Sequence, residues 1–332
     1  MFQVTLRGSH YEIGKQYGIL LKNKGMDYSK PTDVAIRFAA KVEQEIINFV
    51  PELIEEIHGI ADGSGFDFEI VRTYALTVGR SPACTIFAIP GQYSVDGHPI
   101  FARNYDATPA FQDFTLYRTY PKKHFAHMGC CFDMLVGRED GLNEAGVAIA
   151  VAGVHGLYTD KPGVWDHIPI RAVLDHCTSV DQAVTLLERF PHFWTKNFLV
   201  ADAKGHIAIV EAAHQRISVH YPQNEIGVIT NHFASSAMQP FNNPNRTMPK
   251  THDRLQIIKN WFQQQTNVIQ TSQIKNILKN PETGICSNSL ETSTQKGFLT
   301  IWSWIAKLGK RSFEMATGAP ITPSSRFKSY SF

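Results

Sequence analysis

The sequence predicts an α+β protein in which largely antiparallel sheets carry helices on their outer faces. Three observations lead to this fold class. Residues 1–83 have helical periodicity, the chain becomes strand-like from Cys84 onward, and neighbouring strand-like runs are often joined by hairpin turns. Strands joined by short hairpins run antiparallel, and the helical segments between them are then free to cover the sheets.

The first 83 residues are predicted to be mainly helical. Apolar residues recur at spacings of three and four along a long amphipathic helix that Thr32 or Asp33 can cap. Pro51 kinks or divides this helix, and Asp62-Gly63-Ser64-Gly65 ends it before another helical turn over 68–76. The apolar stripe predicts that these helices pack on a core.

Beyond residue 83, strands and helices alternate. The expected strands cover 84–90, 99–102, 114–120, 128–136, 145–154, 197–201, 206–212, 226–231, 298–304 and 312–317. The expected helices cover 168–176, 179–190, 252–264 and 272–280. Residues 137–146 read as a loop and tight turn, 238–250 as an excursion loop, and the chain ends in a polar tail.

Composition excludes several functional classes. The 332 residues are 43% hydrophobic and 19% charged with a net charge of +2, which gives no basic patch for nucleic acid or a membrane surface. No apolar stretch reaches about 18 residues, and the N-terminus lacks a signal-peptide pattern. Five irregularly spaced cysteines predict neither a disulfide framework nor a metal site. We expect a cytoplasmic protein without metal or cofactor, and leave a homo-oligomer open.

One hairpin gathers groups that suit thiol chemistry. The run from Cys84 and the run that ends at Arg103-Asn104-Tyr105-Asp106 flank an Asp-Gly turn at Asp96-Gly97, so the second strand should return beside Cys84. A neighbouring cation lowers the pKa of a thiol from its ordinary ~8.5, and a carboxylate can orient a base. A buried structural cysteine beside a surface ion pair of Arg103 and Asp106 explains the same residues, so the local sequence leaves both interpretations open.

Two asparagines are candidates for an oxyanion hole. Asn143 lies in a glycine-flanked turn, where its backbone N–H could point outward, and Asn231 ends an apolar strand, where its side-chain amide could do the same. An oxyanion hole needs two donors aimed at the developing charge. Asparagine also favours turns and strand ends for its own local hydrogen bonds, so each residue has a structural explanation too.

Six segments in order resemble one family. The hairpin of Cys84-Thr85 and Arg103-Asn104-Tyr105-Asp106 is similar to the active-site hairpin of the N-terminal-nucleophile cysteine hydrolases, above all the acyl-coenzyme A:6-aminopenicillanate acyltransferase-like family (peptidase family C45-like). The choloylglycine and penicillin V hydrolases are more distantly similar. The other matching segments are Gly8 to Gly18, Gly141-Leu142-Asn143-Glu144-Ala145-Gly146, Asn197 to Asp202 with Glu211, Thr230-Asn231-His232-Phe233, and Thr300-Ile301-Trp302-Ser303 with Gly318-Ala319-Pro320.

The resemblance implies a four-layer αββα sandwich of two antiparallel sheets and a chain that cuts itself at the Ala83–Cys84 bond. Residues 1–83 would then be a helical pro-segment, and residues 84–332 the hydrolase core with which it packs as one domain. The cut frees an α-amine on Cys84, which titrates near ~7.7–8.0 and can accept the thiol proton. We expect the cleaved leader to be able to stay bound.

The resemblance also implies roles for single residues. Cys84 is the nucleophile, Arg103 stabilises its thiolate and Asp106 orients the new amine. The Asn143 backbone N–H and the Asn231 side chain bind the oxyanion. Weaker matches make Asn104, Tyr105, Phe233 and Ser303 substrate contacts, while Arg246 and Arg254, taken as surface cations, are the weakest candidates.

The function that follows is a cysteine hydrolase or acyltransferase acting on a linear amide, with an acyl-enzyme on Cys84. Its substrate would be a small amide or an acyl donor, such as an acyl-coenzyme A or a penicillin-like amide. Two alternatives remain. One is an unprocessed amidase or thioesterase with a Cys–His pair that uses His232 or His98, and the other is a catalytically silent protein of this fold that binds small ligands.

Overall fold

The computed structural model of the chain describes most of its residues. These are residues 2–79, 83–108, 114–156, 161–214, 216–243, 245, 248, 250–287, 297–322 and 325–332.

The predicted helices are confirmed in place within the described part of the chain. Pro51 is the first residue of its helix, which explains why it divides the N-terminal helical region as predicted. The helices are α1 (His10–Asn23), α2 (Asp33–Ile46), α3 (Pro51–Ser64), α4 (Phe68–Thr77), α5 (His167–His176), α6 (Val180–Arg189), α7 (Thr251–Gln263) and α8 (Thr271–Lys279).

The described strands form two sheets. The eight-stranded sheet has the order β1 (Phe2–Gly8), β4 (Phe114–Pro121), β5 (His127–Phe132), β6 (Asp140–Asn143), β7 (Ala148–Gly153), β8 (Lys196–Ala201), β9 (Ile207–Ala213), β10 (Arg216–His220). The six-stranded sheet has the order β11 (Gly227–Ile229), β2 (Ala83–Ile89), β3 (Ile100–Ala107), β12 (Leu299–Lys307), β13 (Ser312–Thr317), β14 (Lys328–Ser331).

Four strands were not predicted. β1 lies in the region expected to be helical, and it pairs with β4 in parallel, which is an exception within the largely antiparallel sheets that were expected. β6 lies inside the expected loop 137–146, and its ladder partners are too far along the chain to be seen locally. β10 and β14 are edge strands with largely exposed residues, which lack the apolar run on which the prediction relied.

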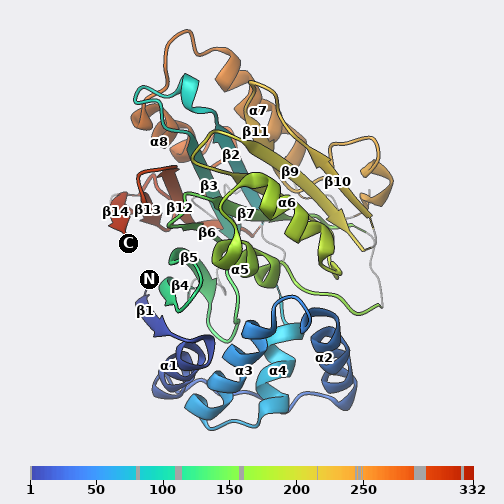
Figure 1. Cartoon of the computed structure of the whole chain (residues 1–332). Helices are drawn as coiled ribbons and strands as arrows, with labels where there is room; N and C mark the ends of the chain where they lie inside the picture. The colour runs from blue at the N-terminus through green and yellow to red at the C-terminus, as the bar shows by residue number, and fades with distance from the viewer. Residues whose placement is uncertain are drawn as a thin grey trace.

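Three apolar clusters define how the sheets and helices pack. The largest lies between the two sheets and extends into the leader helices, and it contains Cys84, Tyr105 and Trp302. A second joins α5 and α6 to the outer side of β7, β8 and β9, and a third joins α7 and α8 to the six-stranded sheet. Figure 1 shows the leader helices α1–α4 gathered at one end of the molecule, below the sheets.

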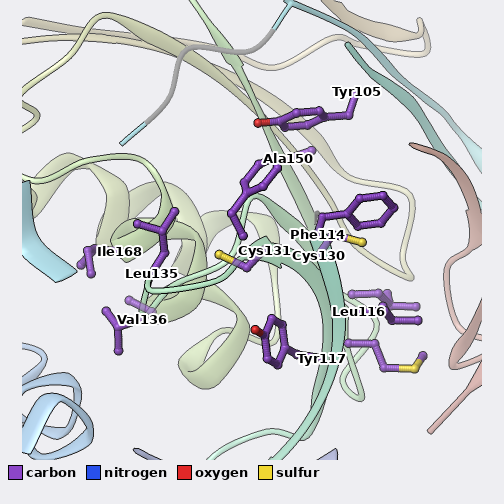
Figure 2. Close-up of a cluster of buried hydrophobic side chains, with 14 of the residues drawn as sticks. Tyr105, Phe114, Leu116, Tyr117, Cys130, Cys131, Leu135, Val136, Ala150 and Ile168 are labelled. Carbon is purple, nitrogen blue, oxygen red and sulfur yellow. The ribbon is translucent and has the colours of Figure 1, made fainter. Parts of the chain in front are cut away.

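Part of the largest cluster lies around β5, as Figure 2 shows. Cys130 and Cys131 are adjacent in this strand, and their sulfurs point in opposite directions, as the alternation of a strand requires. Both side chains are buried, and all five cysteines of the chain are unpaired. The cysteine spacing predicts no disulfide framework, and this prediction is confirmed.

The leader is attached to the rest of the chain by buried charges. The Arg171 guanidinium of α5 binds both carboxylate oxygens of Glu56 in α3, at 3.0 and 2.8 Å, and its Nε donates to Asp175 at 2.8 Å. Asp175 also lies 3.1 Å from ring nitrogens of His10 in α1 and His127 in β5. All of these side chains are at most 3% exposed. One buried network thus joins α1 and α3 of the leader to α5 and β5.

Removing one partner of this network should destabilise the protein strongly. In Glu56→Gln the Arg171 charge loses its carboxylate in a buried site, which costs about 3–5 kcal/mol. We expect the midpoint of urea unfolding to fall accordingly. Lys122→Gln, which breaks an exposed pair with Glu12, is the control and should leave the midpoint almost unchanged. Equal midpoints for the two variants would contradict this account.

The same network predicts acid sensitivity. Burial lowers the pKa of His127 to about 3, despite the opposing effect of Asp175. Between about pH 6.5 and 3 the unfolded chain therefore takes up a proton on this histidine that the folded chain does not. The free energy of unfolding should fall with decreasing pH by up to about 1.4 kcal/mol per unit from this residue. Unfolding curves of His127→Gln between pH 7 and 4 should show a correspondingly smaller slope.

Candidate active site

The predicted hairpin is confirmed, and it fixes which side chains share a face. In the β2–β3 ladder Cys84 lies opposite Tyr105 and Ile86 lies opposite Arg103. Because directly opposed residues point to the same face of a sheet, Cys84, Tyr105 and Arg103 all face the eight-stranded sheet. The Arg103 Nη2 lies 2.8 Å from the Cys84 Sγ, to which it donates a hydrogen bond.

Arg103 is completely buried and is held from several sides. Its Nη1 donates to the Asp140 carboxylate at 2.9 Å and to the Glu139 carbonyl at 3.2 Å, and its Nη2 reaches the Val151 carbonyl at 3.3 Å. Asp140 also accepts the indole N–H of Trp302 at 2.8 Å. The guanidinium therefore has little freedom to move away from the thiol.

Asp140 was not singled out in the sequence. It belongs to a charged run that reads as a surface loop, whereas the structure places it in β6 with a side chain inside the molecule. The buried ion pair with Arg103 needs such a carboxylate, because an unpaired guanidinium in this site would be very costly. The sequence carried no signal for this strand, because three charged residues in a row, Arg138-Glu139-Asp140, lie between Gly137 and Gly141 without apolar alternation.

The Cys84 thiol is protonated in this state. Burial raises its pKa to about 12, against the lowering effect of the Arg103 charge. Its side chain is completely buried, in the apolar cluster between the sheets. A thiol with such a pKa carries almost no thiolate at neutral pH, so attack by Cys84 requires that its proton pass to another group as the new bond forms.

Asn231 contacts the backbone of Cys84. Its Oδ1 accepts the Cys84 backbone N–H at 2.9 Å and an Arg254 N–H at 2.8 Å, and its Nδ2 donates to the Gly153 carbonyl at 2.8 Å. These bonds fix the orientation of the amide. The Cys84 nitrogen, which would become an α-amine after a cut at Ala83–Cys84, thus lies beside a hydrogen-bond acceptor.

The expectation that Arg254 is a surface cation is wrong. Arg254 is completely buried on α7, and it donates to the Cys84 carbonyl, to the Thr85 hydroxyl at 2.9 Å and to Asn231. Its position was predictable in part, because Thr251, Arg254 and Ile258 follow one another at helical spacing and all three are buried. Arg246, the other cation of that prediction, lies outside the described residues.

Asp106 lies on the opposite face of β3 from Arg103. It is directly across the ladder from Ala83, and it accepts the Thr300 hydroxyl at 2.6 Å. A salt bridge between Arg103 and Asp106, the structural explanation of this hairpin, is therefore excluded by the pleat of the strand. The carboxylate is instead beside Ala83, the residue that precedes Cys84.

Asn143 is not brought to the thiol. Its backbone N–H donates to the Val147 carbonyl at 3.0 Å, inside the turn between β6 and β7. Its side chain accepts the Val147 N–H at 2.9 Å and donates to the Leu174 and Cys177 carbonyls at 3.1 and 2.8 Å. This geometry does not support the oxyanion role predicted for its N–H, because the turn already uses that donor.

The weaker substrate candidates have contacts within the fold. Asn104 donates to the Leu278 and Ile285 carbonyls at 2.9 and 2.8 Å and accepts the Ser303 hydroxyl at 2.5 Å, so this pair joins the sheet to α8 and the chain after it. Tyr105 stacks on Trp302 with ring centres 3.8 Å apart. Phe233 is buried in a small apolar cluster.

Neither histidine of the Cys–His alternative is paired with the thiol in the described part of the chain. His232 lies within hydrogen-bond distance of the Thr230 and Thr251 hydroxyls, at 3.1 and 2.9 Å, and burial lowers its pKa to about 4. His98 precedes β3, at the end of the hairpin away from Cys84, about 20 Å along the strand. Within the described ranges, no group of three His, Cys, Asp or Glu residues could hold a metal ion.

None of the helices described is both long and apolar enough to cross a membrane.

A search of curated proteins gives no match. Two solved structures share the fold. A single-residue variant of the conjugated bile acid hydrolase from Clostridium perfringens is 16% identical with a TM-score of 0.51, over 75% of this chain and 97% of that one. The N-acylethanolamine-hydrolyzing acid amidase ortholog from Caenorhabditis elegans is 16% identical with a TM-score of 0.50, over 75% and 100%.

The family is shown by the sequence itself. A family model described as acyl-coenzyme A:6-aminopenicillanic acid acyl-transferase matches residues 94–322, more than half of the chain. The match agrees with the resemblance carried by the ordered motifs, which is thereby confirmed. This chain belongs to the acyl-coenzyme A:6-aminopenicillanic acid acyltransferase family.

Proposed function

We propose that this chain cuts itself at Ala83–Cys84 and that Cys84 then hydrolyses or transfers the acyl group of a linear amide through an acyl-enzyme. The observation that carries the proposal is the 2.8 Å contact from Arg103 to the Cys84 thiol at the start of β2. Family membership supports the reaction class, since the family is described as an acyltransferase. The two solved structures of the same fold are named as hydrolases of conjugated bile acids and of N-acylethanolamines.

The cut supplies what the uncut site lacks. In the uncut chain the Cys84 nitrogen is an amide and cannot accept a proton, and the thiol pKa is about 12. After the cut the same nitrogen is an α-amine that titrates near ~7.7–8.0 and can take the thiol proton. Asn231 Oδ1, 2.9 Å from this nitrogen, and Asp106, opposite Ala83, are then positioned to orient the amine.

The cutting step uses the same thiol. Sγ attacks the Ala83 carbonyl carbon, the bond from that carbon to the Cys84 nitrogen breaks, and the nitrogen gains a proton. Water then hydrolyses the resulting thioester, which frees the thiol and a carboxylate on Ala83. Because the Cys84 side chain is completely buried in the uncut chain, the released end at Ala83 has to move aside before a substrate can reach the thiol.

In the catalytic cycle Sγ attacks the acyl carbon of the substrate and an amine leaves. Arg103 stabilises the thiolate, and the Asn231 amide is assigned to the oxyanion. Water or a second amine then resolves the acyl-enzyme, so hydrolysis and transfer use the same residues. An acyl-coenzyme A or a penicillin-like amide is a substrate of the expected class, and the five unpaired cysteines are compatible with a cytoplasmic location.

The proposal includes the division of the chain into a pro-segment, residues 1–83, and a hydrolase core, residues 84–332. β1 pairs with β4 and the Glu56–Arg171 pair is buried, so we expect the cleaved leader to stay bound. We also infer the four-layer αββα arrangement, with α5 and α6 on the eight-stranded sheet and α7 and α8 on the six-stranded sheet. The packing of these helices in two separate apolar clusters supports it.

Mass spectrometry of the purified protein tests the cut. We expect a leader of about 83 residues and a chain that starts at Cys84, because the thiol that performs the cut belongs to the residue directly after the bond that breaks. Cys84→Ala should remain one chain, and Cys84→Ser should be cut more slowly or not at all. An intact chain that hydrolyses amides would overturn the proposed mechanism and favour a Cys–His enzyme.

The cleaved protein is then offered a panel of 7-amino-4-methylcoumarin amides with acyl groups of increasing length, read as free coumarin. Activity should depend on Cys84, and a thiol-directed acyl probe should label that residue alone. A chain that is cut but neither turns over any amide nor takes up the probe would be a silent binding protein.

Arg254 should be needed for the cut. Arg254→Gln removes two of the hydrogen bonds that hold the Cys84 carbonyl and Asn231 in register, and such displacements cost about 10²-fold in rate. We expect self-cleavage, followed by gel electrophoresis over time, to slow by that order. Lys259→Gln, an exposed cation on the same helix, is the matched control. Equal rates of self-cleavage in the two variants would show that Arg254 is not needed for the cut.

A further inference from the structure

Segment 230–235, which carries Asn231, is held by side chains rather than by a sheet or helix. The ladder of β11 ends at Ile229, and α7 begins only at Thr251. Buried backbone groups without a regular partner need side-chain partners. Asn197 and Glu211, two residues of the matched mid-chain hairpin to which no role has been given, supply many of them.

Asn197 binds the carbonyls on both sides of Asn231. Its Nδ2 donates to the Thr230 carbonyl at 3.0 Å and to the His232 carbonyl at 2.8 Å. Asn197 is only 2% exposed, and its Oδ1 accepts no hydrogen bond within the described part of the chain. A buried acceptor without a partner costs free energy, and an apolar residue of similar size would avoid that cost only by leaving both carbonyls without this donor.

Glu211 holds the other end of the same segment. One of its carboxylate oxygens accepts the Ala234 N–H at 2.5 Å and the Ser235 N–H at 3.2 Å, and the other accepts the Ser235 hydroxyl. Asn197 and Glu211 are direct partners in the β8–β9 ladder. Two adjacent strands thus present one donor and one acceptor to a single stretch of backbone.

We infer that Asn197 and Glu211 are positioning residues for the proposed reaction, which hold segment 230–235 so that the Asn231 side chain meets the Cys84 nitrogen. The inference rests on the proposed function. Neither residue has a hydrogen bond to Cys84 among those described, and each acts through Asn231. The rival interpretation is that they only complete the fold of this segment.

Hydrogen exchange tests directly whether Asn197 and Glu211 hold segment 230–235, and the measurement does not depend on activity. In the full chain, Asn197→Ala and Glu211→Gln should speed exchange in peptides that cover 230–235 by at least about tenfold, because the backbone loses its partners. Asp202→Asn is the matched control. Asp202 is a buried carboxylate at the other end of β8 that accepts the Lys204 and His206 N–H groups at 2.9 and 3.1 Å. Asp202 also accepts the Val180 N–H at 3.1 Å, so this control should affect its own turn and the start of α6, and not 230–235. Unchanged exchange over 230–235 in the first two variants would overturn the inference.

Kinetic measurements test whether the contacts of Asn197 and Glu211 with segment 230–235 contribute to the reaction. With the best coumarin amide of the panel, Asn197→Ala should lower kcat by about 10²-fold and leave KM within about threefold, because misplacement of a group that acts in the transition state affects kcat. Glu211→Gln is the milder change and should show the same pattern of lower kcat and nearly constant KM. It replaces Asn197→Ala in this test if that variant does not fold. Asp202→Asn should lower stability and leave kcat unchanged. Variants that lose stability but keep kcat would show a purely structural role.

A double-mutant cycle identifies the residue through which they act. Asn231→Ala should cost about 10²–10³-fold in kcat, and adding Asn197→Ala should then cost little more. Losses that multiply would overturn the inference. If the wild-type protein shows no Cys84-dependent activity, the proposed function is wrong. The exchange experiment would then still decide whether Asn197 and Glu211 hold segment 230–235.

Discussion

The Arg103 guanidinium is buried between the two sheets, and the packing at the centre of this molecule depends on it. Arg103 comes from β3 and its carboxylate partner Asp140 from β6, so their ion pair joins one sheet to the other. Trp302 of β12 and the Cys130 N–H of β5 bind the same carboxylate, at 2.8 and 3.1 Å. A charge so enclosed is tolerated only when it is paired with an opposite charge. The fold must therefore bring these strands together for the thiol to have its cation.

Cys84 lies between two buried arginines, one on each face of β2. Arg103 reaches the sulfur from between the sheets, whereas Arg254 reaches the Cys84 carbonyl and the Thr85 hydroxyl from α7 on the other side. The same strand alternation that separates these two cations also separates Arg103 from Asp106. One residue is thus fixed at its side chain, its carbonyl and its nitrogen by three different elements, which is the kind of pre-organisation that amide chemistry requires.

Local patterns were sufficient to predict what is local. The Asp-Gly turn between two apolar runs identified the hairpin and placed Arg103 beside Cys84, and Pro51 and the helical periodicity identified the leader helices. Residues that meet across long separations were not predictable. Asp140 reaches Arg103 across 37 positions and Arg254 reaches Cys84 across 170, and a charged residue in an apparently polar run gives no sign that it will be buried. For Asn143 the turn was predictable, but nothing in the sequence indicated that its N–H would donate to the Val147 carbonyl within that turn.

The leader is built into the fold in a way that bears on the proposed cut. β1 extends the eight-stranded sheet beside β4, and Gly14 of α1 approaches α3 so closely that a Cβ there would lie 2.0 Å from the Glu56 carbonyl. Glu56, whose backbone is fixed by that approach, is also the carboxylate that binds Arg171. These contacts are formed by residues far from position 83, so breaking one peptide bond there removes none of them. A cut at Ala83–Cys84 would therefore convert the Cys84 nitrogen into an amine while the packing of the leader on the core stays in place.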